Sequence, residues 1–195
     1  MPFFLDIETI STKSSAVILS AGIVYADASL ETTTYQDVIE NSIFVKFDVK
    51  DQVERLGRHV EKRTVDWWMK QAPAVRDMAM KPSPKDLKAE IGISVLSTWI
   101  NQTRRGKDEL CWIRGFMDST TLEDLTSQLE LPSLFPYNSY RDVRTAIDLM
   151  YPNSKSGYVD VDPTRCIGFD VSNVIKHQPV HDACYDAVMV IYGKQ

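Results

Sequence analysis

The feature that most constrains this chain is a pair of carboxylates at the end of an apolar N-terminal segment. Phe3, Phe4 and Leu5 are typical of a buried strand, and Asp6 and Glu8 follow at positions i and i+2. Because side chains alternate between the two faces of a strand, Asp6 and Glu8 should share one face. Two like charges side by side repel unless a cation lies between them, and carboxylate oxygens suit Mg²⁺ or Mn²⁺. The alternative is a strand that simply ends in a polar turn, and these residues alone leave both open.

The composition is that of an ordinary soluble globular protein. The chain has 195 residues, of which 44% are hydrophobic, so we expect one domain over residues 1–195 with a substantial core. It contains no apolar run near 18 residues and no charged segment ahead of an apolar one at the N-terminus. We therefore expect no membrane span and no secretory signal. Three cysteines without metal-type spacing fit a reducing cytoplasm.

The net charge of −5 argues against nonspecific binding of nucleic acid by bulk charge. It leaves a nucleic-acid enzyme open, because a cluster of carboxylates adds negative charge locally and bound metal ions then neutralise it.

Periodicity along the chain predicts an α/β fold. The first quarter alternates apolar and polar residues in strand period and predicts an antiparallel meander over residues 16–26, 32–39 and 42–47. A short buried strand is expected over residues 110–113. Helices are expected over residues 51–58, 64–71, 84–102, 120–129, 143–150 and 183–192, and residues 151–170 form the longest irregular stretch.

Capping residues set several of these helix boundaries. Thr64 and Ser83 are suitable N-caps for the second and third helices, and Asp142 for the fifth. In the third helix, apolar side chains recur at four-residue steps, at Leu87, Ile91, Val95 and Trp99.

Further carboxylates and one histidine follow in distant segments. Asp118 comes after the strand at 110–113, Asp186 lies on the last helix, and His181 precedes that helix. Together with Asp6 and Glu8 they suggest a phosphoryl-transfer site with two metal ions about 3.5–4 Å apart. A neutral histidine is a suitable general base for the attacking water.

Each of these later residues also has an ordinary structural interpretation. Asp118 could be a helix N-cap, Asp186 a surface residue of an amphipathic helix, and His181 a loop residue at the start of the last helix. His59 and His177 have no carboxylate at useful spacing, so we interpret both as surface or packing residues and expect no zinc site.

Three motifs, in order, resemble those of the DEDD exonuclease superfamily. They are Asp6-x-Glu8-Thr9, Asp118 within residues 115–122, and His181-x₄-Asp186, whose spacing is that of the histidine-containing DEDDh branch. Several other stretches are similar to the exonuclease A group of T4-type bacteriophages and to a related bacterial 3′–5′ exoribonuclease group. These stretches cover residues 64–68, 112–115, 141–145 and 181–184.

The resemblance implies an RNase H-like fold, with a mixed sheet of about five strands flanked by helices. It also implies two Mg²⁺ or Mn²⁺ ions, with Asp6, Glu8 and Asp186 holding one, and Asp6 and Asp118 the other. His181 would deprotonate the attacking water, and 5′-mononucleotides would leave from a 3′ end. A phage origin would place the protein in the host cytoplasm.

Five residues are candidates for substrate binding. Thr9 matches a position that contacts the 3′-terminal nucleotide, and Trp67 is a candidate stacking platform for a base, although wide core packing is the alternative. Arg141 and Arg144 offer planar forks to phosphate oxygens. Arg114 stands close ahead of Asp118, where many relatives carry Asn, and this departure bears on substrate choice.

The leading hypothesis is a metal-dependent 3′–5′ exonuclease on single-stranded nucleic acid, with DNA favoured over RNA. The alternatives are an exoribonuclease of the same superfamily and a catalytically silent nucleic-acid-binding module. A homodimer that builds part of the active-site wall is a further hypothesis.

Overall fold

A mixed five-stranded sheet forms the centre of the structure, which is a computed structural model describing residues 2–106 and 109–194. The strands in spatial order are β4 (Ser42–Lys46), β2 (Ile18–Tyr25), β1 (Phe3–Thr9), β5 (Cys111–Ile113) and β6 (Tyr140–Asp142). The first three pair antiparallel, as the predicted meander requires, and β5 and β6 continue parallel to β1. The prediction of a mixed sheet of about five strands is confirmed.

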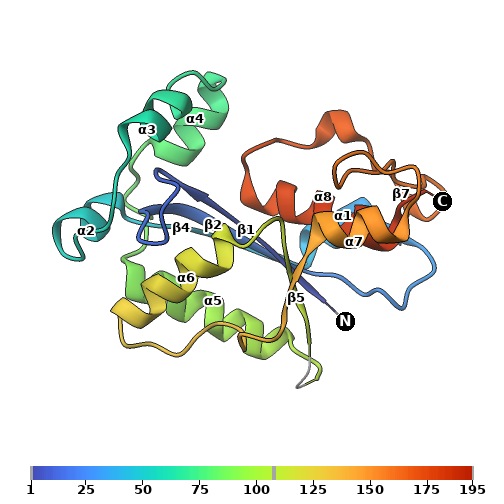
Figure 1. The fold of residues 1–195 in the computed structure, drawn as a ribbon, viewed down its shortest axis with the longest axis horizontal. Helices are drawn as coiled ribbons and strands as arrows, with labels where there is room; N and C mark the ends of the chain where they lie inside the picture. The colour runs from blue at the N-terminus through green and yellow to red at the C-terminus, as the bar shows by residue number, and fades with distance from the viewer. Residues whose placement is uncertain (1, 107–108, 195) are drawn as a thin grey trace.

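Alternation along β1 divides the core into two layers. Phe3, Leu5 and Ile7 face α5 (Ala89–Thr103) and α6 (Met117–Gln128). Phe4 points the other way, into a second cluster with α7 (Val143–Met150) and α8 (Pro179–Tyr192). Figure 1 shows these two helical layers on opposite sides of the sheet. Because Asp6 and Glu8 have the parity of Phe4, they lie on the face that α8 covers.

Three short helices pack beyond one end of the central strands. They are α2 (Val49–Glu54), α3 (Lys62–Trp68) and α4 (Pro73–Met80), and α3 and α4 stand apart from the two main layers in Figure 1. Trp68 of α3 is 1% exposed and packs with Ile10 and Leu19 in a third cluster. This cluster fixes α3 next to the end of β1, where the carboxylates lie.

The predicted strand at residues 32–39 is wrong. Only β3 (Thr33–Thr34) is extended there, and α1 (Tyr35–Glu40) follows it. The Oγ1 of Thr34 accepts the backbone N–H of Asp37 at 3.1 Å, so Thr34 is an N-cap and its hydroxyl reaches the Asp37 carboxylate at 2.7 Å. This capping pattern is visible in the sequence, and it overrides the β-branched residues that suggested a strand.

The predicted start of the long central helix is also wrong. Ser83 and Asp86 form a turn, in which the backbone N–H of Ser83 donates to the Asp86 carboxylate and the N–H of Asp86 donates to the Ser83 carbonyl. The backbone of Leu87 bonds to Lys46 and Asp48. Leu87 is therefore held in a bridge with Phe47, just after β4, and α5 begins only at Ala89. Its buried face carries Ala89, Gly92, Ile93, Leu96 and Ile100, whereas Ile91 and Val95 are exposed.

The other helix boundaries need smaller corrections. Helix α3 begins at Lys62, with Glu61 rather than Thr64 at the N-cap position, and a separate helix, α4, begins at Pro73. Helix α7 is confirmed as predicted, with the Oδ1 of Asp142 accepting the N–H of Thr145 at 2.8 Å. Helix α8 begins earlier than predicted, at Pro179, so its first turn includes His181.

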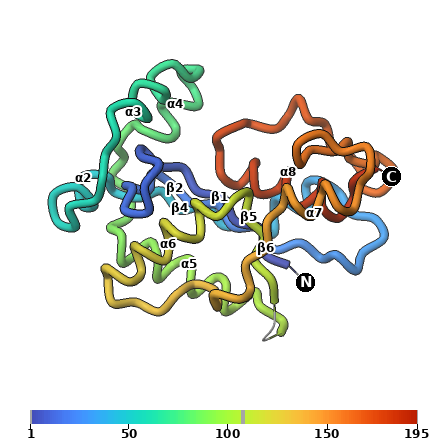
Figure 2. The backbone as a smooth tube through the Cα atoms, viewed as in Figure 1, coloured from blue at the N-terminus to red at the C-terminus, as the bar shows by residue number. Residues whose placement is uncertain are grey.

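The connection from α7 to α8 is largely irregular, as predicted, and Figure 2 shows it as the long orange and red path. It contains β7 (Cys166–Ile167), which pairs with β3, and a 3₁₀ turn at Val171–Asn173. Within the described residues, every helix is too short or too polar to cross a bilayer.

Candidate active site

A cavity of about 510 Å³ opens beside β1, and all four predicted metal-ligating carboxylates line it. They are Asp6 and Glu8 of β1, Asp118 of α6 and Asp186 of α8. The structure therefore brings together four residues from three distant segments, as the motif order predicts. Asp6 and Glu8 share one face of the strand, directly before a register shift between Glu8 and Thr9.

A glycine in the neighbouring strand lets α8 approach this face. Gly22 pairs with Asp6 in the β1–β2 ladder. A β-carbon on Gly22 would lie 2.4 Å from backbone atoms of Pro179 and Val180. Only a residue without a side chain fits there, so the first turn of α8 rests against the sheet and its carboxylates lie over β1.

The ordinary interpretations of Asp118 and Asp186 are both wrong. Phe116, not Asp118, occupies the N-cap position of α6, and Asp118 is only 6% exposed inside the first turn. Asp186 is likewise 6% exposed, so it is not a surface residue of α8. Both side chains face the cavity, and a buried carboxylate requires a compensating positive partner.

Asp186 has such a partner in Arg114. The Arg114 guanidinium donates to the Asp186 Oδ1 from Nη2 at 2.6 Å and from Nε at 2.9 Å. Its Nη1 also donates to the carbonyl of Gly157 at 3.0 Å, and the guanidinium lies 4.2 Å from the centre of the Tyr158 ring. Arg114, predicted to bind substrate, thus lines the cavity while tying Asp186 to the connection between α7 and α8.

Burial and the repulsion of neighbouring carboxylates make Asp6 and Asp118 hard to ionise. Burial, followed by the charges of Glu8 and Asp118, raises the pKa of Asp6 well above its ordinary value. Burial and Glu8 likewise raise the pKa of Asp118. Burial also raises the pKa of Asp186, and Arg114 offsets only part of that effect.

The carboxylate oxygens of the cavity suit a divalent cation as ligands. The Oδ2 of Asp6 is buried and has no hydrogen-bond partner among the described residues. A buried carboxylate oxygen without a donor is costly, and a cation between the carboxylates would remove that cost. Oxygen ligands of this kind match the preference of Mg²⁺ and Mn²⁺.

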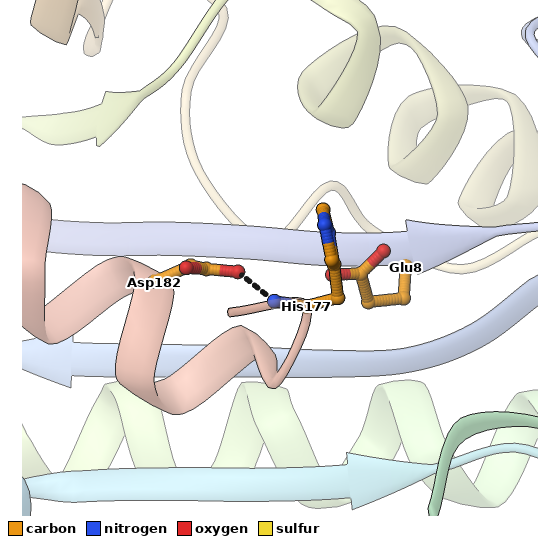
Figure 3. Close-up of side chains that lie close together, drawn as sticks. All are labelled: Glu8, His177 and Asp182. Atoms are coloured by element: carbon orange, nitrogen blue, oxygen red, sulfur yellow. Dashed lines mark hydrogen bonds and ion pairs between the residues drawn. The ribbon is translucent and has the colours of Figure 1, made fainter. Parts of the chain in front are cut away.

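Asp182 and His177 are among the cavity residues that the sequence-based prediction missed. Nδ1 of His177 lies 3.7 Å from Oε1 of Glu8, and the His177 backbone N–H donates to Oδ2 of Asp182 at 2.7 Å (Figure 3). Burial and the charge of Glu8 raise the pKa of Asp182 to about 6, and the contact with Glu8 raises the pKa of His177.

The interpretation of His177 as a residue without carboxylate partners is therefore wrong. Its partner Glu8 comes from the opposite end of the chain, so no local spacing could reveal it. Asp182 did carry a signal, because it lies one helical turn before Asp186 on α8. His59, by contrast, bonds through Nδ1 to the Ser11 hydroxyl at 2.7 Å and serves packing, as expected.

His181 lies outside the carboxylate cavity in this structure. Its Nδ1 accepts the backbone N–H of Ile175 at 3.4 Å, and its ring lines a separate cavity beside Thr34 and Tyr35. Burial lowers the pKa of His181, which favours the neutral imidazole. The structure thus leaves the predicted role of His181 as general base untested.

The four other candidates for substrate binding occupy different positions. Arg144 is exposed and lines the cavity, whereas Arg141 is exposed on β6 and bonds to backbone carbonyls nearby. The Thr9 hydroxyl donates to the carbonyl of Ser11 at 2.8 Å and is buried. Trp67 is 41% exposed, and its ring meets the His177 ring edge-on at 4.9 Å.

Comparison with known proteins gives the family. The model of the 3′–5′ exoribonuclease Rv2179c-like domain matches residues 1–193. The chain is 25% identical to an exodeoxyribonuclease of Enterobacteria phage T4 over 207 aligned positions, which cover 98% of this chain and 88% of that protein.

A solved structure, the cell-death related nuclease 4 (CRN-4), is similar with a TM-score of 0.53 at 13% identity. The match covers 96% of this chain but only 61% of that nuclease. It supports the RNase H-like fold that the motifs implied. The four carboxylates in one cavity, the order of their motifs and the match over nearly the whole chain agree, and the chain belongs to the 3′–5′ exoribonuclease Rv2179c-like domain family.

Proposed function

We propose that this protein is a metal-dependent 3′–5′ exonuclease that releases 5′-mononucleotides from single-stranded nucleic acid. The observation that carries the proposal is the convergence of Asp6, Glu8, Asp118 and Asp186 on one cavity, with the buried Oδ2 of Asp6 unpartnered. The family match supports the same reaction class.

The four carboxylates would hold two Mg²⁺ or Mn²⁺ ions, with Asp6, Glu8 and Asp186 around one and Asp6 and Asp118 at the other. When bound, such ions activate a water and neutralise charge on the scissile phosphate. In the proposed step the attacking water loses a proton to a general base and its oxygen bonds to phosphorus, while the bond to the 3′ oxygen of the preceding nucleotide breaks and that oxygen takes up a proton to become the new 3′-hydroxyl end.

His181 is the proposed general base because it occupies the histidine position of the third motif. This role requires its imidazole to turn from the backbone of Ile175 toward the carboxylates. His177 is the competing candidate, since it already lines the cavity. Single-turnover rates of the His181→Asn and His177→Asn proteins separate the two candidates. Loss of the general base should lower the rate about 10²–10⁴-fold and should abolish the pH dependence that comes from its ionisation.

DNA is the proposed substrate, supported by similarity over nearly the whole chain to a phage exodeoxyribonuclease. RNA is the second candidate, and the description of the family as exoribonuclease favours it. The two differ at the 2′-hydroxyl, which a protein can read as donor and acceptor.

The deciding experiment digests matched single-stranded DNA and RNA oligonucleotides, each labelled at one end, with Mg²⁺, with Mn²⁺ and with EDTA. We expect mononucleotides released from the 3′ end, no reaction in EDTA, and a higher kcat/KM on DNA. Asp6→Asn and Asp118→Asn proteins should be inactive. Tight binding of ends without any release would instead indicate a silent binding module.

A further inference from the structure

Glu8, His177 and Asp182 form a mixed nitrogen and oxygen cluster beside the four-carboxylate set. One potential ligand atom from each residue lies within 4.8 Å of the other two. They come from β1, from the connection before α8 and from the first turn of α8. Figure 3 shows the His177 ring next to the Glu8 side chain, with Asp182 bonded to the His177 backbone.

We propose that these three residues bind a borderline divalent cation of the Zn²⁺ class, at a site that shares only Glu8 with the four carboxylates. Imidazole nitrogen is a preferred ligand of Zn²⁺ and similar ions, whereas Mg²⁺ prefers oxygen. One imidazole with two carboxylates leaves a fourth position for water, as in open zinc sites. This inference goes beyond the proposed exonuclease activity and differs from the expectation, drawn from the sequence, that the chain has no zinc site.

The distances are close to those of a bound site. Ligand atoms in a tetrahedral zinc site are about 3.3 Å apart, given bonds of about 2.0 Å. Nδ1 of His177 and Oε1 of Glu8 are already 3.7 Å apart. All three ligand atoms lie within 4.8 Å of one another, so binding requires them to move closer by at most about 1.5 Å.

Three contacts hold His177 in place. Its ring packs edge-on against Trp67 at 4.9 Å and Trp68 at 6.0 Å between ring centres. Its backbone N–H is fixed by Asp182. A ring positioned before the cation arrives loses less conformational freedom on binding.

A separate observation at the same cavity also points to a cation. The buried Oδ2 of Asp6 is unpartnered among the described residues, and Asp6 lies on the same face of β1 as Glu8. The cavity therefore presents more negative oxygen than the protein's own donors satisfy. Since Glu8 belongs to both sets of ligands, Zn²⁺ at the His177 site should reduce the affinity for Mg²⁺.

Calorimetric titration of the full chain tests this directly. Zn²⁺ added to wild-type protein in Mg²⁺-free buffer should bind, and His177→Ala should lower that affinity at least about tenfold. His177→Phe, which keeps a ring against Trp67 but has no nitrogen, should lose as much. Asp182→Asn should weaken Zn²⁺ binding, and His59→Ala should leave it unchanged.

The Asp118→Asn protein separates this inference from the proposed function. It should lose Mg²⁺ affinity while keeping Zn²⁺ affinity, because Asp118 lies outside the three-residue set. Wild-type Zn²⁺ affinity in both His177 variants, or no Zn²⁺ binding by wild-type protein, would overturn the zinc site without touching the exonuclease proposal. If the protein neither binds Mg²⁺ nor degrades DNA or RNA, the exonuclease proposal is wrong, and the zinc-site proposal is unaffected. Circular dichroism confirms that each variant is folded.

Discussion

Arg114 donates from Nε and Nη2 to Asp186, so a buried carboxylate expected to ligate metal is held by a guanidinium of the same chain. The two side chains are 13% and 9% exposed. A pair this well buried is costly to break, because removing one partner leaves the other charge uncompensated. Arg114 therefore supplies positive charge at a place where a bound cation can also supply it.

Replacing Arg114 by alanine should destabilise the metal-free protein by about 3–5 kcal/mol, the usual cost of orphaning a buried charge. Mg²⁺ should reduce this loss, because a cation at Asp186 replaces the missing charge. Urea unfolding in EDTA and in Mg²⁺ measures both. Arg76→Ala is the control, since its ion pair with Asp77 is on the surface and should contribute at most about 1 kcal/mol. An equal loss of unfolding free energy in EDTA and in Mg²⁺ would show that a bound cation does not replace the charge of Arg114.

The pKa of Asp182, raised to about 6, predicts how the stability of the metal-free protein depends on pH. In the unfolded chain this carboxyl ionises near its ordinary value of about 3.9. Between these two values the folded protein holds the proton more tightly, so the contribution of Asp182 to stability is present below about pH 4 and is lost as the pH rises through about 6.

Asp182→Asn keeps an acceptor oxygen for the His177 N–H but cannot ionise. In EDTA it should match wild-type stability near pH 4 and exceed it at pH 7, by on the order of 1–3 kcal/mol. Denaturant unfolding at several pH values measures the difference. Asp162→Asn should have the opposite sign, because hydrogen bonds from Thr164 lower the pKa of Asp162: it should be less stable than wild type at pH 7, and this difference should shrink only below about pH 4. A pH-independent difference for Asp182→Asn would refute the assignment.

An element of the fold could be predicted from the sequence only where the interaction that determines it is local. The shared face of Asp6 and Glu8 follows from strand alternation, and the start of α7 follows from the cap at Asp142, so both were predictable. The start of α5 was not, because Leu87 bonds to residues of the β4 region far along the chain.

The same reasoning separates the predictable part of the site from the rest. The order of the motifs predicted the four carboxylates. Two pairings that shape the cavity were not predictable, because each joins residues far apart in the sequence: Arg114 with Asp186, and His177 with Glu8. No periodicity reports such contacts. The position of His181 outside the cavity depends on the path of the connection before α8, which has little regular structure to read from a pattern.

Arg144 and Arg141 form a matched pair for testing phosphate binding, because both are exposed and only Arg144 lines the cavity. Arg144→Ala should raise KM about tenfold, a loss of about 1.4 kcal/mol, and should lower the salt dependence of binding by about 0.7 in log–log slope. Arg141→Ala should change both less. Steady-state kinetics at several salt concentrations measure this, and an unchanged KM for Arg144→Ala would remove that residue from the substrate site.

Gly22 should be indispensable because α8 rests on it. A β-carbon there meets backbone atoms of Pro179 and Val180 at 2.4 Å, and backbone cannot yield as a flexible side chain does. Gly22→Ala should cost about 1–3 kcal/mol through overpacking, which lowers the melting temperature by about 2–12 °C in a chain of this size.

The same substitution should move the first turn of α8, and with it Asp182 and Asp186, away from β1. Mg²⁺ should therefore raise the melting temperature of Gly22→Ala less than that of the wild type. Gly106→Ala is the control, because its added β-carbon would meet no atom of the described residues closer than 4.0 Å and should leave both quantities unchanged. A Gly22→Ala protein with wild-type melting temperature and wild-type response to Mg²⁺ would show that the position of α8 does not depend on this glycine.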